Sequence, residues 1–378
     1  DAPPMPMERA SCTFAMMAWL CFAKGGLFLP LDRVRRDFAS QGAPIASSTL
    51  TRWSTRGADL LLPIAGAVRM SLLADTHIRT DGTGLRVVTK RLKASPVKGS
   101  PRPGLTDEDG WLVNANPAYN GQILVFGNDE HAVFWFTEDK KGSHALDFLT
   151  LGEDPKTREP IRWSGTITAD AISAHDCLFT DGERIEAGCN AHGFRKFRDE
   201  MDTAPLLASQ AMGFIDGFYK AEAKAKERKL TGAALLAHRQ ANAGPIVAAF
   251  KQWLAEHIDD LLDTNPVRKA MVYYRNHWDA LTRFLSDPDV ELDNNWSERA
   301  LRNIALLRNN SLYASGRVGA IRLCTLFTLI QTCRVLGVDA YAYLVWALER
   351  VVPHKNNRGL KPSDLTPAAY KALQQQGA

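Results

Sequence analysis

The feature that most constrains the fold of this chain is a change of pattern along its length, from helical periodicity to short β-favouring runs and back again. Between residues 71 and 202, short apolar runs are bounded by Gly, Asn and Asp, which is typical of strands joined by turns. The predicted strands cover residues 85–88, 123–126, 132–136, 165–169 and 185–189. Apolar residues at helical spacing precede and follow this region. The sequence therefore predicts an α/β fold in which helices flank a mixed sheet.

Residues 1–70 are predicted to be helical. Leu31, Val34 and Phe38 have helical spacing in a first helix over residues 31–40. A Gly-Ala-Pro sequence ends that helix, and Ser47-Ser48 are expected to cap a second helix that carries Leu50, Trp53 and Leu60–Leu62. Two helices joined by a short turn and carrying several arginines resemble a DNA-binding helix-turn-helix, although a plain helical hairpin gives the same pattern.

The rest of the chain divides into further segments by pattern. Residues 203–290 are mainly helical, and one continuous helix is expected over residues 266–285. Residues 291–352 contain a helix that begins at an Asp-Asn-Asn sequence, followed by a final helical pair. A Gly- and Pro-rich connection is expected at residues 99–104, and residues 353–378 are expected to form an irregular polar tail.

Composition limits the class of protein. The 378 residues are 45% hydrophobic and 23% charged without a run of 18 apolar residues, so we expect a globular chain with no membrane span. Six cysteines without a Cys-x-x-Cys pair suit a reducing compartment, and a net charge of +4 suits a polyanionic partner. Because the chain begins at Asp1 and not at Met, we expect an N-terminal portion to precede it, and we identify no signal peptide.

Three acidic residues are candidates for a metal site, although they lie far apart along the chain. Asp81 lies just before a predicted strand, Asp170 ends another, and Glu298 lies on the helix after the Asp-Asn-Asn sequence. Residues 299–323 contain five arginines and no Asp, Glu or Lys, which suits either a phosphate-binding surface or a structural ion pair with Glu298. Carboxylates bind Mg²⁺, and two such ions about 3.5–4 Å apart stabilise the attacking and leaving oxygens in phosphoryl transfer.

Other acids compete for two of these positions. Asp75 is the alternative to Asp81, and Asp176 or Asp181 is the alternative to Asp170. Asp170 is favoured because it directly follows an apolar strand, and Asp81 is favoured by the motif around it. The spacing of the acids decides nothing by itself.

Several motifs occur together between residues 29 and 352. They are Leu29-Pro30-Leu31, Ser48-Thr49-Leu50 with Trp53, Thr80-Asp81-Gly82-Thr83, Thr168-Ala169-Asp170, and residues 189–197, 278–285, 293–302, 315–317 and 329–339. In combination they are similar to the DDE transposases of the bacterial insertion sequence 66 family. The resemblance implies an RNase H-like catalytic domain, formed by residues 71–202 and 291–352. It also implies that the helical residues 203–290 are largely an insertion within that fold.

The resemblance further implies a function. Such an enzyme cleaves DNA at the ends of a mobile element and joins the freed 3′-hydroxyl to target DNA. Asp81, Asp170 and Glu298 would be its catalytic and metal-binding residues, with two Mg²⁺ ions that Mn²⁺ can replace. Double-stranded DNA, a homo-oligomer on that DNA, accessory proteins and a cytoplasmic, nucleoid-associated location in a bacterium are the corresponding expectations. The alternatives are an RNase H-like nuclease without strand transfer and a catalytically silent DNA-binding descendant.

Basic side chains near these motifs are candidates for DNA contacts, although arginines paired with acids on a helix surface give the same pattern. These candidates are Arg299, Arg302, Arg195, Lys196 and Arg52.

Four further residues are expected to support the acids without binding the metal. Cys189 and His192 match the Cys-x-x-His motif of the family, and Asn294 and Asn295 precede Glu298. Two ligands are too few for a zinc site. Three positions depart from the family's pattern: Gly82 replaces Glu, Ile172 replaces an aromatic residue and Asn190 replaces Trp.

Overall fold

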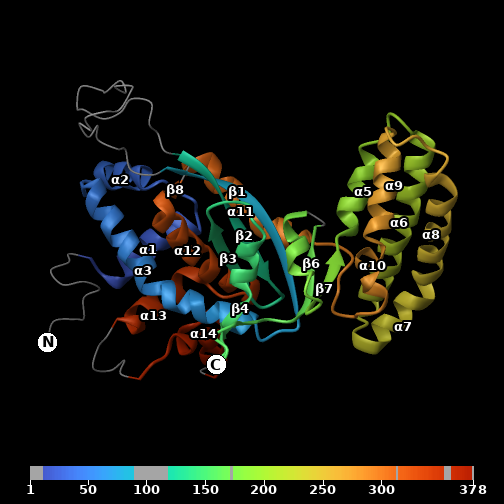
Figure 1. Ribbon diagram of the computed structural model, residues 1–378. Helices are drawn as coiled ribbons and strands as arrows, with labels where there is room; N and C mark the ends of the chain where they lie inside the picture. Colours follow the sequence, from blue (N-terminus) through green and yellow to red (C-terminus); the bar gives the residue numbers. More distant parts are fainter. Residues whose placement is uncertain (1–11, 89–117, 171–172, 312–313, 353–358, 377–378) are drawn as a thin grey trace. The chain divides into compact units, whose positions relative to one another are not determined.

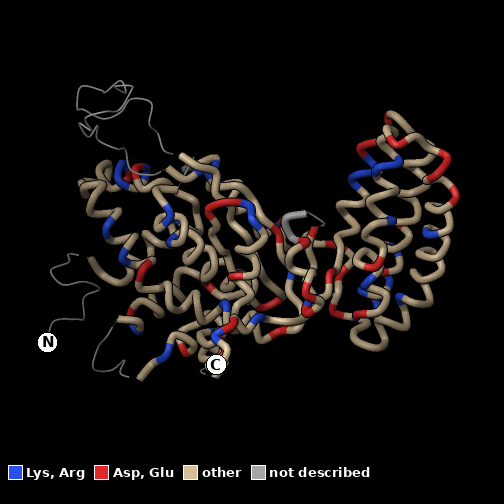
Figure 2. The backbone as a smooth tube through the Cα atoms, in the orientation of Figure 1, with Lys and Arg blue, Asp and Glu red and all other residues tan. Residues whose placement is uncertain are grey.

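The computed structural model describes residues 12–88, 118–170, 173–311, 314–352 and 359–376 (Figure 1). The chain forms two compact units. Unit 1 consists of Asp1–Ala74, Gly82–His144 and Ala300–Ala378, and unit 2 consists of Asp75–Asp81 and Ala145–Arg299. Acidic and basic residues are interspersed within each unit (Figure 2). The connection predicted at residues 99–104, and Ile172, lie outside the described residues.

Within the described residues, six strands form a mixed sheet. They are β1 (His77–Val88), β2 (Ala118–Gly127), β3 (Ala132–Thr137), β6 (Gly165–Ala169), β7 (Arg184–Gly188) and β8 (Ala314–Ser315). Their order is β3-β2-β1-β6-β7, and β8 pairs with the end of β1. β2 and β3 form the predicted antiparallel hairpin, whereas β6 is parallel to both β1 and β7. The predicted mixed α/β fold is confirmed. β1 begins at His77 and not at residue 85, so Asp81 lies within this strand and not just before it, because β1 pairs with β6 from His77 onward.

Unit 1 is organised around α12 (Gly316–Leu336), a buried apolar helix. It packs against α1 (Phe14–Gly25), α3 (Ser47–Leu72), α13 (Ala340–Val351) and β3. By length and composition α12 could cross a membrane, but 67% of its apolar window is buried within the fold. Burial of this kind is typical of the core helix of a globular unit.

Two threonines of α12 bind the polar edge of β3. Phe134 N donates a hydrogen bond to Thr328 Oγ1 at 2.9 Å, and Ala132 N donates one to Thr332 Oγ1 at 3.2 Å. An uncovered edge strand offers unpaired backbone groups to other chains. The helix therefore covers that edge, and these bonds explain why threonines occur in an otherwise apolar core helix.

The predicted N-terminal helices are present, but the second is longer than expected. α2 (Leu31–Ser40) has the predicted bounds, whereas α3 has 26 residues and continues through Pro63. One side of α3 is buried along its length because it packs on α1 and α12. Tertiary packing therefore extends this helix beyond the local breaker signals.

Unit 2 combines β6 and β7 with several helices. The helices are α5 (Asn190–Arg198), α6 (Pro205–Glu227), α7 (Gly232–Asn242), α8 (Gly244–Ile258), α9 (Pro266–Asn276) and α10 (Trp278–Leu281). Phe197, Phe218, Phe250 and Phe284 are buried in one core with Ala187 of β7. The helices therefore share their core with the strand beside them. Two shorter strands, β4 (Thr150–Glu153) and β5 (Pro160–Arg162), form a separate ribbon after α4 (Ser143–Phe148).

Two predictions about regular structure are wrong. The helix expected over residues 266–285 is interrupted at His277, whose backbone (φ −111°, ψ 24°) is not helical. The interruption allows Leu281 to pack against Gly188 of β7. In the expected irregular tail, Pro362–Leu365 and α14 (Pro367–Gln376) are helical, because Leu365 is buried and Tyr370 packs on the rings of α13.

Candidate active site

Asp81 and Asp170 come to the same level of two neighbouring strands. β1 and β6 are parallel, and their register pairs Arg79 with Thr168. Asp81 and Asp170 each follow two residues later. Alternate residues of a strand point to the same face, and neighbouring strands lie about 4.8 Å apart. Both carboxylates therefore project from one face at the carboxyl end of this parallel pair, where open α/β sheets commonly bind ligands.

Asp170 is a buried carboxyl group, with 9% of its surface exposed. Burial raises the pKa of Asp170 to about 6, because a charged carboxylate loses hydration inside the protein. A backbone hydrogen bond lowers this pKa, the negative charge of Glu298 raises it, and Arg195 lowers it. Asp170 is thus within electrostatic reach of the third predicted acid, and added positive charge would favour its ionised form.

The side chain of Asn294 ties β1 to the start of α11 (Asn295–Ser311). Its Nδ2 donates to Thr80 O at 2.7 Å, and its Oδ1 accepts from Ser297 Oγ at 2.7 Å. Asn294 is buried, so water does not compete for these bonds. Thr80 precedes Asp81, and Ser297 precedes Glu298. One side chain therefore positions the backbone beside both acids.

The start of α11 has the capping chemistry that the Asp-Asn-Asn sequence predicts. Asp293 Oδ1 accepts from Asn295 N at 3.0 Å, and Asp293 Oδ2 accepts from Tyr219 OH at 3.1 Å. The buried Arg79 of β1 forms an ion pair with Glu291 at 3.2 Å, and its guanidinium lies 5.9 Å from the ring centroid of Trp296. These contacts place the first turn of α11 on the face of β1 that carries Asp81.

Glu298, in that first turn, is bound by α5. Arg195 Nη2 donates to Glu298 Oε1, and His192 Nε2 lies 3.7 Å from the same oxygen. This hydrogen bond raises the pKa of the Arg195 guanidinium, so Arg195 is charged. Burial lowers the pKa of His192, as does Arg195, whereas Glu298 and Asp81 raise it. Glu298 and Asp81 therefore both act electrostatically on His192. Asp170 interacts in the same way with Glu298 and Arg195.

The beginning of α5 is held by Asn190, which is 1% exposed. Its backbone N donates to Leu292 O at 2.9 Å, its Nδ2 donates to Leu281 O at 2.9 Å, and its Oδ1 accepts from Tyr274 OH at 3.1 Å. Asn190, which occupies the position where the resembled family usually has Trp, is therefore a buried polar residue that connects several elements. Its bonds join α5 to the segment before α11 and to α10.

Cys189 and Gly193 complete this junction. Asn294 N donates to Cys189 Sγ at 3.2 Å, and burial raises the pKa of Cys189 to about 11, so the thiol stays protonated. A protonated thiol is a poor metal ligand. A Cβ added to Gly193 would lie 2.3 Å from the ring of Tyr274, so only glycine allows this approach of α5 and α9.

Comparison with known proteins identifies the family of this chain. The model of the transposase IS66 family matches residues 9–322 of the chain. The chain belongs to this family. Three proteins of Sinorhizobium fredii (strain NBRC 101917 / NGR234) are similar to it, and each bears the name of an uncharacterized protein. They are y4jD (26% identical, covering 93% of this chain and 65% of that protein), y4hP (24%, 91% and 60%) and y4qI (26%, 97% and 65%). This IS66-family chain thus spans just under two thirds of the length of these relatives.

The basic residues predicted to contact DNA have different surroundings in the IS66-family chain. Arg195 binds Glu298, and the Lys196 ammonium lies 4.7 Å from the ring centroid of Tyr273. The other three are exposed, and their side chains make no hydrogen bond or ion pair within the described residues: Arg52, Arg299 and Arg302. Their role in DNA binding stays a prediction.

The competing acids have less suitable surroundings than Asp170 and Asp81. Asp75 is exposed and accepts a hydrogen bond from Thr76 N at 2.7 Å. Asp176 is exposed, and Asp181 binds Arg184. None of these three is buried at the end of a strand, as Asp170 is.

The carboxylates of Asp81, Asp170 and Glu298 are suitable ligands for a hard divalent cation, but their side chains are not arranged around one metal position. Three carboxylates on neighbouring elements are the donors that Mg²⁺ prefers. Among the described residues, however, no group of three or more His, Cys, Asp or Glu side chains is arranged to hold a metal ion. The ion pair with Arg195 engages Oε1, one of the two carboxylate oxygens of Glu298. A metal that binds through Oε1 would have to displace Arg195.

Sequence reasoning missed the partner of Glu298. Arg195 follows His192 by three residues on a helix, so both lie on one face. That spacing was a signal for a shared target, but it could not identify the target as Glu298, 103 residues further along the chain.

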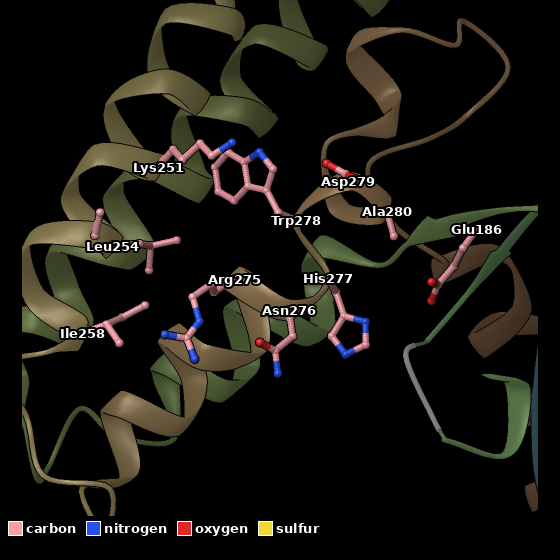
Figure 3. Close-up of a pocket in the computed structure, with 11 residues that line it drawn as sticks. Glu186, Lys251, Leu254, Ile258, Arg275, Asn276, His277, Trp278, Asp279 and Ala280 are labelled. Atoms are coloured by element: carbon pink, nitrogen blue, oxygen red, sulfur yellow. The ribbon is translucent and has the colours of Figure 1, made fainter. Parts of the chain in front are cut away.

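Unit 2 also has a groove of about 400 Å³ beside the interruption between α9 and α10 (Figure 3). Its lining carries both signs of charge, with Lys251 and Arg275 opposed by Glu186 and Asp279. The Lys251 ammonium lies 5.3 Å from the ring centroid of Trp278. Lys251, Arg275 and Asp279 are exposed, and the two signs of charge are equally represented. The groove therefore shows no preference for a ligand of one charge.

Proposed function

We propose that this IS66-family chain carries the catalytic site of a DDE transposase with an RNase H-like fold, in which Asp81, Asp170 and Glu298 hold two Mg²⁺ ions. The observation that carries the proposal is the convergence of these acids within unit 2. The β1–β6 register brings Asp81 and Asp170 level, and Asn294 binds Thr80 at the start of the helix that bears Glu298. The mixed sheet, with Asp81 within β1 and Asp170 directly after the parallel strand β6, supports the proposed fold.

The proposed reaction consists of two phosphoryl transfers. In the first, water attacks a phosphodiester at the element end, the P–O3′ bond breaks, and a 3′-hydroxyl and a 5′-phosphate result. In the second, this 3′-hydroxyl attacks a target phosphodiester, forming one P–O bond and releasing the target's own 3′-hydroxyl. Bound Mg²⁺ would supply charge stabilisation at the attacking and leaving oxygens, and Mn²⁺ is a suitable substitute.

The residues around the acids have distinct parts in this proposal. Asn294 and Asn190 keep the backbones beside the acids in place. Arg195 holds Glu298 before metal binds, and once displaced its guanidinium is positioned to bind a DNA phosphate. The neutral His192 lies beside Glu298 without adding a positive charge that would repel a cation. Double-stranded DNA is the proposed substrate, and assembly as a homo-oligomer on DNA, with or without accessory proteins, is part of the same proposal.

A cleavage assay with matched variants tests the assignment. Wild-type protein is incubated with supercoiled plasmid carrying the element's terminal repeats, with Mg²⁺ or Mn²⁺, and both nicked and joined products are measured. Glu298→Gln and Asp170→Asn should lose at least about 100-fold in rate while DNA affinity persists, because they alter groups that act at the reacting phosphate. Asp176→Asn is the control and should retain activity. Unchanged turnover in Glu298→Gln would refute the proposed triad.

The ion pair between Arg195 and Glu298 favours one alternative, a descendant that binds DNA without cleaving it. In that case Arg195 replaces the metal permanently as the partner of Glu298. Wild-type protein would then bind DNA but show neither Mn²⁺ binding nor cleavage. Nicks without joined products would instead indicate a nuclease that lacks strand transfer.

A further inference from the structure

A cavity of about 530 Å³ lies within unit 1, apart from the acids described above. It is lined by the end of α1, the start of α2, one side of α3, the end of α11, β8 and the first half of α12. We call it the Lys24 cavity, after the one lysine among its lining residues. No Asp or Glu is among the described residues that line it. Its volume is in the range of small-molecule sites, roughly 300–1,000 Å³.

The ammonium group of Lys24 is mostly buried. Within the described residues, its side chain makes no hydrogen bond and no ion pair. Burial lowers the pKa of Lys24, Cys21 raises it and Arg322 lowers it. Cys21 is itself a protonated thiol, because burial raises its pKa to about 12. No acid among the described residues therefore neutralises the charge that Lys24 would carry, and an unpaired charge is unfavourable for a buried cation.

Other residues with hydrogen-bond donors also line the Lys24 cavity. Arg322 uses Nε and Nη2 to bind the Asp59 carboxylate, both at 2.7 Å, which leaves its Nη1 available. Asp59 is thus paired with Arg322, and it is not among the described residues that line the cavity. The Ser54 hydroxyl and the Asn310 amide also line the cavity, and their side chains make no hydrogen bond within the described residues. These donors together match an anion with several oxygens, such as a phosphate group.

The remaining wall of the Lys24 cavity is apolar. Leu29, Leu31, Leu307 and Leu323 line it. Inorganic phosphate alone would leave this wall and most of the volume unused. A ligand with a phosphate at one end and a less polar body at the other matches both parts.

We propose that the Lys24 cavity binds a phosphate-bearing ligand of nucleotide size, with its phosphate on Lys24 and Arg322 and its sugar or base against the leucines. The ligand has two possible sources, a free nucleotide or a nucleotide unit of DNA. The proposal does not depend on the triad, because the cavity uses none of its residues.

Calorimetry with deoxyadenosine monophosphate, deoxyadenosine and inorganic phosphate tests the proposal on the full chain. The nucleotide should bind, and both smaller probes should bind at least about tenfold more weakly, because each lacks one of the two matched parts. Lys24→Met keeps the length of the side chain and should weaken nucleotide binding by about tenfold or more. Lys140→Met, at an exposed position with the same charge change, should bind normally. Absence of nucleotide binding, or equal binding by Lys24→Met, would overturn the proposal.

Three further measurements make the result specific. Without ligand, Lys24→Met should melt at a higher temperature than wild type, because it removes a buried charge that lacks a partner. In the wild-type protein the nucleotide should protect Lys24 from acetylation, measured by mass spectrometry, and this readout remains if the variant fails to fold. Competition by a 20-base-pair duplex would identify DNA as the source, and binding without such competition would identify a free nucleotide. A nucleotide that leaves Lys24 acetylation unchanged would contradict the proposal.

Discussion

Replacing Arg195 with Met should tighten the binding of divalent metal. Arg195 Nη2 donates to Glu298 Oε1, so a metal that binds through this oxygen must displace the guanidinium, whose positive charge also opposes a cation at Oε2. A hydrogen bond to a charged group contributes about 1.5–3 kcal/mol when shielded from water. Here the side chains are 37% and 32% exposed, so solvent screening reduces the value to about 1 kcal/mol. Arg195→Met should therefore bind Mn²⁺ about fivefold more tightly than wild type.

The assay is a Mn²⁺ titration without DNA at pH 7.5, followed by calorimetry or by the electron paramagnetic resonance signal of the unbound ion. Arg198→Met is the matched control, because Arg198 is on the same helix, is exposed, and pairs with Asp199 at 3.3 Å. It makes the same change in net charge without touching Glu298, and it should leave the affinity nearly unchanged. The variant Arg195→Met with Glu298→Gln should lose the gain, because the two substitutions act on one contact.

Weaker or equal Mn²⁺ binding by Arg195→Met would refute the reasoning, since Arg195 would then not compete with the metal. An equal gain in Mn²⁺ affinity in Arg198→Met would show that the effect comes from the change in net charge and not from the contact with Glu298. A gain confined to Arg195→Met would show that the ion pair controls access to Glu298.

Four further predictions concern Asp170 and the residues around the site. The pKa of Asp170 is raised to about 6 from an ordinary value of 3.8, so its ionisation lowers the stability of the fold progressively as pH rises from about 4 to 6. Asp170→Asn should therefore raise the free energy of unfolding at pH 7 by about 1–2 kcal/mol. The gain should be smaller at pH 5, and urea titrations at the two pH values measure both. Asp181→Asn should show the opposite sign at pH 7, because hydrogen bonds from the Glu183 backbone and Arg184 lower the pKa of Asp181. Asn190→Leu should lower the free energy of unfolding by about 2–4 kcal/mol, since it leaves buried backbone and hydroxyl groups unpaired, and Tyr274→Phe should cost only about 1 kcal/mol in the same assay. Asn294→Ala should cost about 1–3 kcal/mol and lower the cleavage rate more than DNA affinity; equal rates in the variant and wild type would argue against its positioning role.

The local parts of the site could be predicted from sequence because they depend on local chemistry. An apolar run that ends in Asp170 predicts a strand with an acid at its end, and the Asp-Asn-Asn sequence predicts the start of the helix that carries Glu298. Both elements are present, with β6 ending one residue before Asp170 and α11 beginning at Asn295. Motif resemblance identified the family that the comparisons then showed.

The lengths and interruptions of several elements could not be predicted in the same way. α3 continues through Pro63 because its buried side packs on α1 and α12. The break at His277 and the helix α14 likewise depend on what Leu281 and Tyr370 contact elsewhere in the fold. Local propensities are small beside such packing energies, so the tertiary contacts prevail.

By itself, then, the sequence of this chain determined which elements form around the acids, because strand alternation, helix caps and turns are set by residues a few positions apart. Only the tertiary structure decided that Arg195 holds Glu298, that Asn190 and Asn294 join the elements around the acids, and that Lys24 is mostly buried with no ion pair to any residue that the structure describes. These depend on contacts between residues tens to hundreds of positions apart. Such contacts are set by how the helices and strands pack in space, and no local pattern encodes that packing.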